Sequence, residues 1–360
     1  MAAAHPPAIE IVEVPIPTAV GADGWDLFEA VSAVDSAVEV AAYSTPEVAE
    51  SAADLLPDWQ DPKQIVRLLA AVDAGRVVGR LGVYAERETP DTGFAQVKVL
   101  PAERRRGVGT LLDARLGELV HEQGYRKLIA YAVSPEAPGE RLAPPTGAGS
   151  VPRDNPEVRF LLARGWRLEQ VERASRYPLP PDAALLDRLR ADAESHAEGY
   201  RVHSWTGPSP EPFRAGMAEL YERMTTDAPS AGLEEPPETW DVARVIEHES
   251  RQDRAPATML VTAVEHVATG RLAGMTRLRV PNDPGRAVQQ WDTIVRREDR
   301  GHRLGTLLKV VNLQELAARM PGHPSILTWN AEENRPMLDV NEAIGFVPIG
   351  QEGAWRKDLA

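Results

Sequence analysis

Two basic, glycine-containing loops carry the residue types in this sequence that are best suited to chemistry. The first runs from Arg104 to Thr110, and the second runs from Arg300 to Thr306. Each follows an apolar strand pattern and precedes a helical one, an order that presents backbone N–H groups and a helix N-terminus to an anion. The loops align without gaps, because Gly305 follows Gly109 by 196 residues (305 − 109). The sequence therefore predicts a phosphorylated ligand and two copies of its loop.

A second pair of motifs follows the loops. Asn155-Pro156 opens a helical pattern that stops at Gly165, and Asn334 opens one that stops at Gly345. Asn before a helix, Pro in its first turn and Gly just past its end are helix-boundary signals. The spacing is now 180 residues (345 − 165), so the first copy carries 16 extra residues (196 − 180), within a Pro- and Gly-rich insertion at 135–156. A duplicated domain with one inserted loop explains both spacings.

Strand and helix patterns recur in the same order in both halves. Short strands come first and helices connect the later strands, which predicts an α/β (α+β) fold with a mixed, mostly antiparallel sheet flanked by helices in each half. A length of 360 residues also favours two domains. We expect an N-terminal domain at 1–178, which includes the insertion 135–156, a linker helix at 179–199 and a C-terminal domain at 200–360.

Composition restricts the class of protein. The absence of cysteine excludes disulfides, thiolate metal sites and a cysteine nucleophile, and the eight histidines show no metal-ligand spacing, so we expect no metal. A net charge of −14 disfavours nucleic acid and anionic membranes as partners. The N-terminal residues lack a signal-peptide pattern, and no apolar run approaches the roughly 20 residues that span a bilayer, so we expect a cytoplasmic protein. The signatures of P-loop NTPases and dinucleotide-binding folds are also missing.

These motifs resemble the GNAT superfamily of acyl-CoA-dependent N-acyltransferases. The family loop reads Arg/Gln-x-x-Gly-x-Gly/Ala after a strand ending Val-x-Pro, and the first copy has Val99-Leu100-Pro101, Arg104, Gly107 and Gly109. Because both halves carry the pattern, the chain is more similar to tandem, two-domain GNAT proteins of the mycothiol synthase type. The resemblance implies acetyl-CoA as co-substrate and direct transfer of its acetyl group to a primary amine in a ternary complex, which fits the lack of cysteine.

The resemblance also assigns coenzyme contacts. Loop N–H groups hold the pyrophosphate, and the main chain of the preceding strand pairs with the pantetheine arm. In the first copy these residues are Val97, Val99, Arg104, Arg105, Arg106, Gly107, Val108, Gly109 and Thr110. In the second copy they are Thr293, Val295, Arg300, Gly301, His302, Arg303, Leu304, Gly305, Thr306, Asn330 and Asn334. Alternatives remain open for Asn330, as an Asx-turn residue, and for Asn334, as a helix cap.

One substitution separates the two loops. Arg303 replaces the first loop glycine of the family, so the second loop either takes another backbone path or adds a charge to the phosphates. We interpret it as a working variant; the alternative is a loop that no longer binds coenzyme.

Catalytic groups match the family less well. GNAT enzymes commonly carry a tyrosine four residues before the glycine that ends the late helix, to protonate the leaving thiolate, and the residues here are Leu161 and Asn341. Asn341 can donate a hydrogen bond near the sulfur. On the strand before the second loop, Asp292 aligns with Gln96 and is either a general base or ammonium anchor, or a carboxylate that pairs with an arginine or caps a loop. These two residues favour the C-terminal domain as the catalytic one.

The sequence thus predicts an N-acetyltransferase that acts on a small-molecule amine. The acidic chain favours a cationic acceptor, such as an aminoglycoside-like molecule, a polyamine or an amino-sugar conjugate, with a protein N-terminus or lysine also open. The alternative from another class is a non-catalytic acyl-CoA-binding or sensing protein with degenerate GNAT domains, because neither copy has the tyrosine. Oligomeric state is not encoded in any of these patterns.

Overall fold

The computed structural model of the chain describes residues 9–227 and 229–359. The chain forms two compact units. Unit 1 contains Met1–Val171 together with Gln351–Ala360, and unit 2 contains Glu172–Gly350. The mixed strand and helix content of each unit agrees with the predicted fold class.

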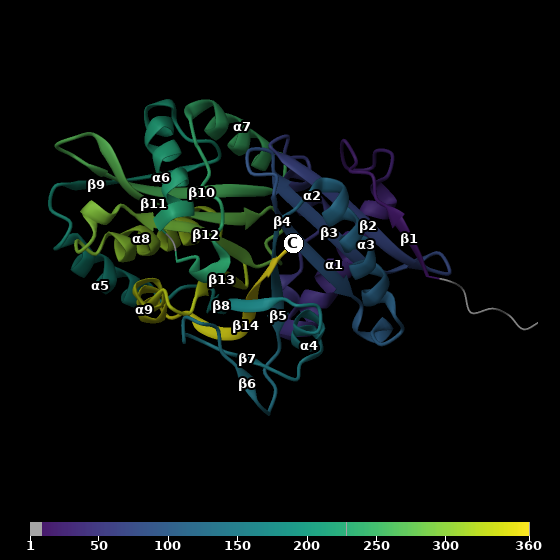
Figure 1. The fold of residues 1–360 in the computed structure, drawn as a ribbon. Helices are drawn as coiled ribbons and strands as arrows, with labels where there is room; N and C mark the ends of the chain where they lie inside the picture. The colour runs from purple at the N-terminus through teal and green to yellow at the C-terminus, as the bar shows by residue number, and fades with distance from the viewer. Residues whose placement is uncertain (1–8, 228, 360) are drawn as a thin grey trace, which may run out of the picture. The chain divides into compact units, whose positions relative to one another are not determined.

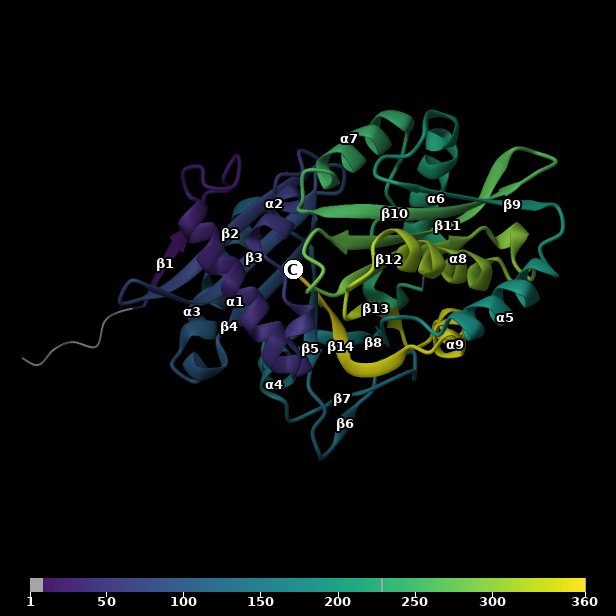
Figure 2. The same ribbon diagram turned by 180° about the vertical axis from the view of Figure 1, so that it is seen from behind.

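Unit 1 is a sheet with helices on both faces, and α1 and α3 lie on opposite faces of it (Figure 1, Figure 2). Its helices are α1 (Trp25–Tyr43), α2 (Ala52–Trp59), α3 (Val108–Gln123) and α4 (Pro156–Leu162), with 3-10 turns η1 (Pro46–Val48) and η2 (Pro101–Glu103). Its strands are β1 (Glu10–Glu13), β2 (Gln64–Asp73), β3 (Arg76–Glu86), β4 (Thr92–Val99), β5 (Lys127–Ser134), and the short β6 (Arg141–Leu142) and β7 (Val151–Pro152).

Unit 2 repeats this arrangement. Its helices are α5 (Ala183–Glu194), α6 (Arg214–Asp227), α7 (Val242–Gln252), α8 (Leu304–Arg319) and α9 (Arg335–Ile344), with 3-10 turns η3 (Glu211–Phe213), η4 (Ala231–Leu233) and η5 (Arg297–Asp299). Its strands are β9 (Tyr200–Thr206), β10 (Ala257–His266), β11 (Arg271–Pro281), β12 (Val288–Val295) and β13 (Ser325–Ala331). Two long strands, β8 (Arg167–Pro178) and β14 (Val347–Asp358), contribute residues to both units.

The strand order is the same in both sheets. Unit 1 has the order β1-β2-β3-β4-β5-β14 and unit 2 the order β9-β10-β11-β12-β13-β8. Neighbours are antiparallel except for the parallel pairs β4–β5 and β12–β13. This mixed sheet is the one predicted, and the parallel pair in each unit joins the loop-bearing strand to the strand that precedes the late helix.

The last strand of each sheet comes from the other half of the sequence. In unit 1, β5 pairs with β14 from Gln351 to Asp358. In unit 2, β13 pairs with β8, from Ser325 beside Pro178 to Ala331 beside Glu172. The unit boundaries therefore fall within β8 and β14 and differ from a division at residues 178 and 200.

Two apolar layers hold each sheet between its helices. In unit 1, Leu112, Leu116 and Leu119 of α3 are buried on one face, and Phe28 and Val31 of α1 are buried on the other. Burial of three leucines at helical spacing explains why α3 forms where the sequence predicts it. In unit 2 the corresponding layers lie beneath α6 with α7 and beneath α5 with α8.

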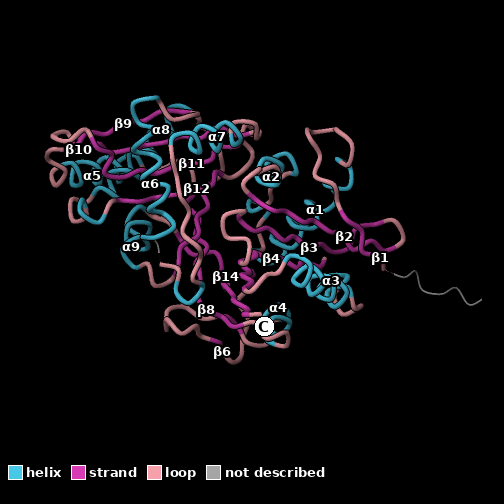
Figure 3. Tube along the Cα trace, turned by 45° about the horizontal axis from the view of Figure 1, so that its top comes forward, coloured by secondary structure: helices cyan, strands magenta, loops and turns pink. Residues whose placement is uncertain are grey.

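Two local features differ from the sequence expectation. Helix α2 was not predicted; it contains Pro57, and Ser51 and Asp54 form a capping box that starts it. The insertion at 135–156 is mostly loop, as Figure 3 shows around β6, and its two-residue strands β6 and β7 pair with each other. A helix, α5, lies within the span 179–199 and belongs to unit 2.

Candidate functional site

In both units the strand before the basic loop separates from its parallel neighbour. Strand β4 pairs with β5 only from Thr92 to Phe94, and β12 pairs with β13 only at Val288 and Gln289. Beyond these residues the two strands diverge, so main-chain groups at 95–99 and 290–295 face a gap. A bound chain can hydrogen-bond to such an edge.

The two units differ in how the strand diverges. In unit 2, Trp291 and Asp292 together oppose Arg277, which is a β-bulge. In unit 1, β4 pairs with β3 in unbroken register from Phe94 to Val99. Only the second strand is therefore bent at a bulge where its acidic residue lies.

Both loops share one backbone conformation despite their different residues. In unit 1, Arg105 (φ 66°) and Gly107 (φ 88°) are left-handed; in unit 2, Gly301 (φ 91°) and Arg303 (φ 53°) are left-handed at the equivalent positions. Arginine and glycine have thus exchanged places along the same path. Of the two alternatives for Arg303, the structure shows the unchanged path, at a local cost of about 1–2 kcal/mol for a non-glycine residue in this conformation.

A cleft of about 830 Å³ opens in unit 1 along the gap between β4 and β5. This volume lies in the range of small-molecule sites, roughly 300–1,000 Å³. The predicted coenzyme residues that line it are Val97, Val99, Arg104, Arg105, Gly107, Gly109 and Thr110. Two others point elsewhere: Arg106 forms ion pairs with Asp73 and Glu103, and Val108 is buried in the core.

The loop arginines differ in their counter-charges. Arg104 and Arg300 are anchored alike, since each Nε donates to the carbonyl oxygen that ends the strand, at 3.3 Å from Val99 and 3.2 Å from Val295. Across the residues that the structure describes, no carboxylate pairs with Arg104 or its neighbour Arg105.

In unit 2 both loop arginines have acidic neighbours. Nη2 of Arg300 lies 3.7 Å from the Asp227 carboxylate, and Arg303 forms an ion pair with Asp192 on α5. His302 is also engaged, with its Nδ1 3.2 Å from the carbonyl oxygen of His196. The first loop therefore presents uncompensated positive charge to its cleft, whereas the second loop is largely compensated.

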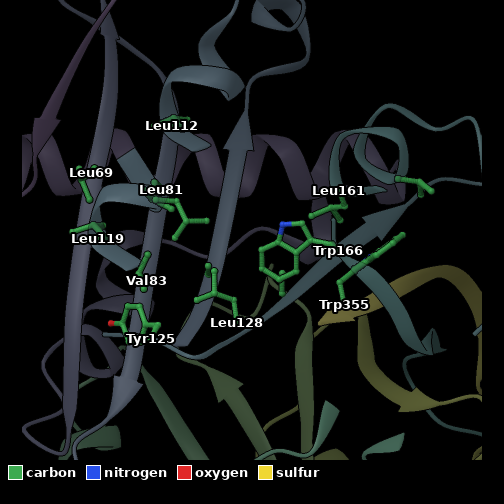
Figure 4. Close-up of a cluster of buried hydrophobic side chains, with 14 of the residues drawn as sticks. Leu69, Leu81, Val83, Leu112, Leu119, Tyr125, Leu128, Leu161, Trp166 and Trp355 are labelled. Carbon is green, nitrogen blue, oxygen red and sulfur yellow. The ribbon is translucent and has the colours of Figure 1, made fainter. Parts of the chain in front are cut away.

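Helix α4 forms one wall of the unit 1 cleft. Arg164 lies 2.9 Å from the Asp113 carboxylate on α3, and donates to the Thr110 hydroxyl at 3.2 Å. The Phe160 ring is so close to Gly109 that a Cβ there would lie 3.0 Å from it. Leu161, at the position of the family tyrosine, lies in the buried cluster with Trp166 and Trp355 (Figure 4), so it contributes packing.

A charged cluster that was not predicted from the sequence lies on the α1 side of the same cleft. Lys98 on β4 lies 2.5 Å from Glu39 and 3.0 Å from Asp35, and Arg80 forms an ion pair with Asp35. Burial would lower the pKa of Lys98, but the two carboxylates raise it above its usual value, so this lysine stays charged. Tyr131 lines the cleft from β5. The sequence pattern that could have indicated this cluster is the alternation of β4: Lys98 lies between Val97 and Val99, so its side chain leaves the opposite face of the sheet.

Asp292 pairs with an arginine, which was one of its two expected roles. Its carboxylate lies 2.8 Å from Nη2 of the buried Arg277. Arg277 also donates to the Tyr221 hydroxyl, which in turn donates to Glu249 at 3.1 Å. Burial raises the pKa of Tyr221, so the phenol remains protonated within this network. Asp292 is still 28% exposed and accessible to a ligand.

Two of the three predicted asparagines of unit 2, Asn330 and Asn341, are in contact. Asn341 is buried and donates through Nδ2 to Asn330 Oδ1 at 2.7 Å, while its own Oδ1 has no hydrogen-bond partner. Asn334 precedes α9 at the cap position but forms no side-chain cap hydrogen bond. Asn155 in unit 1 likewise donates to Ser134 rather than capping α4.

Of the remaining predicted residues of the second copy, some contact other side chains of unit 2 and others lie at the protein surface. Thr293 shares a 2.8 Å hydroxyl contact with Thr276, Val295 packs against the core beneath α8, and Leu304 is buried. Nothing approaches within 4 Å of a Cβ built at Gly305, and Thr306 is half-buried on the first turn of α8.

Over residues 9–227 and 229–359, no helix has the length and apolar content needed to cross a membrane. Within the same ranges, no three His, Asp or Glu side chains are grouped so that they could hold a metal ion.

Comparisons with known proteins agree with this geometry. The acetyltransferase (GNAT) family matches residues 34–142, which include the cleft-forming strands and loop of unit 1. A solved tandem GNAT protein from the clavulanic acid biosynthesis pathway is 25% identical, with 98% of each chain covered and a TM-score of 0.72. A GCN5-related N-acetyltransferase from Sphaerobacter thermophilus shares the fold at 15% identity, with 97% of this chain and 95% of that chain covered and a TM-score of 0.63. Among curated proteins, none matches this sequence significantly.

Proposed function

Since this chain is a tandem member of the GNAT superfamily of acetyltransferases, we propose that it transfers an acetyl group from acetyl-CoA to a primary amine. The observation that carries the proposal is the unit 1 cleft, which joins a gap between parted strands to a loop with two uncompensated arginines. Acetyl-CoA has the matching chemistry, since it combines a long polar arm with a highly charged phosphate end.

The loop would hold the phosphates of the coenzyme. Gly109 and Thr110, in the first turn of α3, line the cleft, and the N-terminus of a helix favours negative charge through its dipole and its first N–H groups. Arg104 and Arg105 add charge-assisted hydrogen bonds of the kind that phosphate favours. The arm would then pair with the free main-chain edge at 95–99, beside Val97 and Val99.

The transfer itself would be a direct attack of the amine on the thioester carbonyl. The C–N bond forms, the C–S bond breaks, and the proton lost by the amine reaches the thiolate. No cysteine is available for an acyl-enzyme. With Leu161 in the core, Tyr131 is the tyrosine that lines this cleft, and its hydroxyl is our candidate proton donor.

Unit 2 is a second candidate for the catalytic centre, favoured by its bulge. The bulge places Asp292 on the strand beside the gap, where Arg277 orients its carboxylate to act as a base or an ammonium anchor. Asn341, with one amide hydrogen bonded to Asn330, would support the sulfur or carbonyl oxygen. The cationic small-molecule acceptor and the cytoplasmic location remain predictions from the sequence.

The first experiment is calorimetric titration of the full chain with acetyl-CoA, using a matched pair of variants. Thr110→Asp and Thr306→Asp each place a carboxylate in the first turn of the helix after a loop, where it favours the helix dipole but repels phosphate. We expect Thr110→Asp to abolish binding in unit 1. Unchanged binding in both variants would show that neither loop holds the coenzyme.

An amine panel then separates enzyme from sensor. Acetylation of an amine by the unmodified chain supports the transferase. Tight coenzyme binding without acetylation of any amine would favour the alternative, a non-catalytic acyl-CoA-binding protein, for which the missing tyrosine at Leu161 and Asn341 is the supporting observation.

A further inference from the structure

The unit 1 cleft extends to the face of the sheet opposite the phosphate loop. Helix α1 contacts both β4 and β5, and it lies on the face opposite α3, which follows the loop (Figure 2). The C-terminal part of α1 lines the cleft. Because the loop on the α3 side would hold the coenzyme phosphates, the α1 side of the cleft remains for the acceptor amine.

This α1 side combines apolar walls with an ion pair. Small apolar side chains line it from two elements: Val38, Ala41 and Ala42 from α1, and Val133 from β5. Glu39 of α1 and Lys98 of β4 line the same cleft and form an ion pair of 2.5 Å. An acceptor that fits here has an alkyl part and a charged part.

The ion pair leaves one oxygen of Glu39 open to a ligand. Nζ of Lys98 lies 2.5 Å from Oε1 of Glu39 and 3.0 Å from Oδ1 of Asp35, and Arg80 also pairs with Asp35, so the four charges balance. No donor among the described residues hydrogen-bonds to Oε2 of Glu39, and this side chain is 21% exposed. A carboxylate oxygen that is held in place and open to the cleft favours a cationic group.

The end of α1 favours positive charge independently. Ala41 and Ala42 belong to the last turn of the helix, which ends at Tyr43, and no basic residue lies in that turn. A helix C-terminus carries the equivalent of about half a negative charge, which stabilises a cation close to it. The carboxylate of Glu39 and the end of the helix therefore select the same sign of charge.

Unit 2 shows that the fold does not require this cluster. Lys98 corresponds to Ile294, 196 residues later, which is buried in the core beneath α6 and α7. An apolar residue therefore suits this position of the strand. Replacement of a buried ion pair by apolar side chains is also often neutral or stabilising. The stability of the sheet thus gives no reason for the charges in unit 1, whereas a ligand does.

We propose that the α1 side of the unit 1 cleft binds an aliphatic diamine, with Glu39 as the anchor for its second ammonium group. Lys98 is a positioning residue that holds the Glu39 carboxylate, and its side-chain length separates that carboxylate from the main chain of β4, where the thioester would lie. A diamine spans this separation, with its alkyl chain along the apolar walls.

The amine at the far end of the diamine is then the one that reacts. In its neutral form it attacks the thioester carbonyl, the C–N bond forms and the C–S bond breaks. Coenzyme A leaves as the thiol, which carries the proton lost by the amine. The inference rests on the proposed function, since it names the acceptor class for that same transfer.

The test compares putrescine with butylamine, which has the same carbon chain and a single amine, in steady-state kinetics of the full chain. We expect kcat/KM for putrescine to exceed that for butylamine at least about 10-fold, as a hydrogen bond between charged groups allows. Glu39→Gln should bring the ratio close to unity and leave the Kd for acetyl-CoA unchanged by calorimetry. Glu29→Gln removes the same charge from an exposed position of α1 outside the cleft and should keep the ratio.

A second variant tests the positioning role. Lys98→Met releases Glu39, so it should raise the KM for putrescine more than it lowers kcat. Circular dichroism checks that each variant is folded. A fall in kcat alone, with the KM unchanged, would contradict the positioning role.

The outcomes separate this inference from the proposed function. Equal kcat/KM for the two amines, or a preference that survives Glu39→Gln, overturns the diamine site and leaves the transferase intact. Acetylation of putrescine that survives Thr110→Asp places the reaction outside unit 1 and also overturns the site. If acetyl-CoA binds but no amine is acetylated, the proposed function fails, and calorimetric titration of putrescine in the presence of coenzyme A decides the site alone. Binding that Glu39→Gln removes would support the site, and no binding would overturn it.

Discussion

Replacing Arg105 by glycine should move stability and coenzyme affinity in opposite directions. Arg105 is left-handed at φ 66° and lines the unit 1 cleft, and unit 2 has Gly301 at the same position. Relief of the left-handed strain gains about 1–2 kcal/mol, and the extra freedom of glycine in the unfolded chain costs about 0.4–1 kcal/mol. We therefore expect unit 1 to gain about 0.5–1 kcal/mol, or roughly 1–3 °C in Tm.

The affinity should fall because a charge leaves the cleft. A hydrogen bond from arginine to a charged group contributes about 1.5–3 kcal/mol, and the lower end applies to an exposed side chain. The Kd for acetyl-CoA at unit 1 should therefore rise about 10-fold. Calorimetric titration measures the Kd, and differential scanning calorimetry measures the Tm of the same sample.

Two variants serve as controls. Arg106→Ala removes the same charge from the same loop, but Arg106 faces Asp73 and Glu103 rather than the cleft, so the Kd should change less than about 3-fold. Arg303→Gly relieves the same strain in unit 2 and should leave unit 1 binding unchanged. A parallel loss of stability and affinity in Arg105→Gly, or an unchanged Kd, would refute the assignment of Arg105 to the phosphates.

Three further predictions concern other parts of the chain. Asp292→Asn should lower kcat/KM at least about 100-fold on a confirmed amine if unit 2 performs the transfer. It should also lower the free energy of unfolding by about 1–2 kcal/mol, because Arg277 stays buried without its carboxylate partner. Unchanged turnover in steady-state kinetics would remove Asp292 from the mechanism. Burial and the charge of Glu235 raise the pKa of Glu172 from 4.5 to about 7. Between pH 4.5 and about pH 7 the folded state thus keeps a proton that the unfolded state loses, so the parent loses stability as the pH rises. In urea unfolding, Glu172→Gln should be more stable than the parent by about 1–3 kcal/mol above pH 7 and equal to it below about pH 4. Trp355→Ala should cost about 3–5 kcal/mol and lower hydrogen-exchange protection in peptides of unit 1; a loss confined to unit 2 peptides would contradict the assignment of this strand.

Much of the fold could be predicted because its signals are local. Helix α8 begins directly after the second basic loop, where the sequence predicts a helix, because the loop and the apolar residues at helical spacing that follow it are local signals. Strand exchange could not be predicted in this way. Neither β8 nor β14 has a strict apolar alternation, and only packing of the whole unit determines which sheet edge each one joins.

The candidate site shows the same division between local and non-local information. The place of both basic loops, between a strand and a helix, could be predicted because the signals on either side of each loop are local. The partners of those arginines could not. Asp192 and Asp227 are distant in sequence from the second loop, so nothing local indicates that they compensate its charge. Lys98 and its carboxylates were missed for the same reason.

The exchange of final strands has a consequence for how the protein is made. Residues 351–358 complete the sheet of unit 1, so β5 has an open edge throughout synthesis of everything between residues 134 and 351. Domains commonly fold in the order in which they leave the ribosome, but unit 1 cannot complete its sheet until residues 351–358 have been translated, after all of unit 2. The edge strand of unit 2, residues 172–178 of β8, is synthesised before the rest of that unit. The nascent chain therefore finishes its second half first, and the exposed edge of β5 is the surface that a chaperone has most reason to cover.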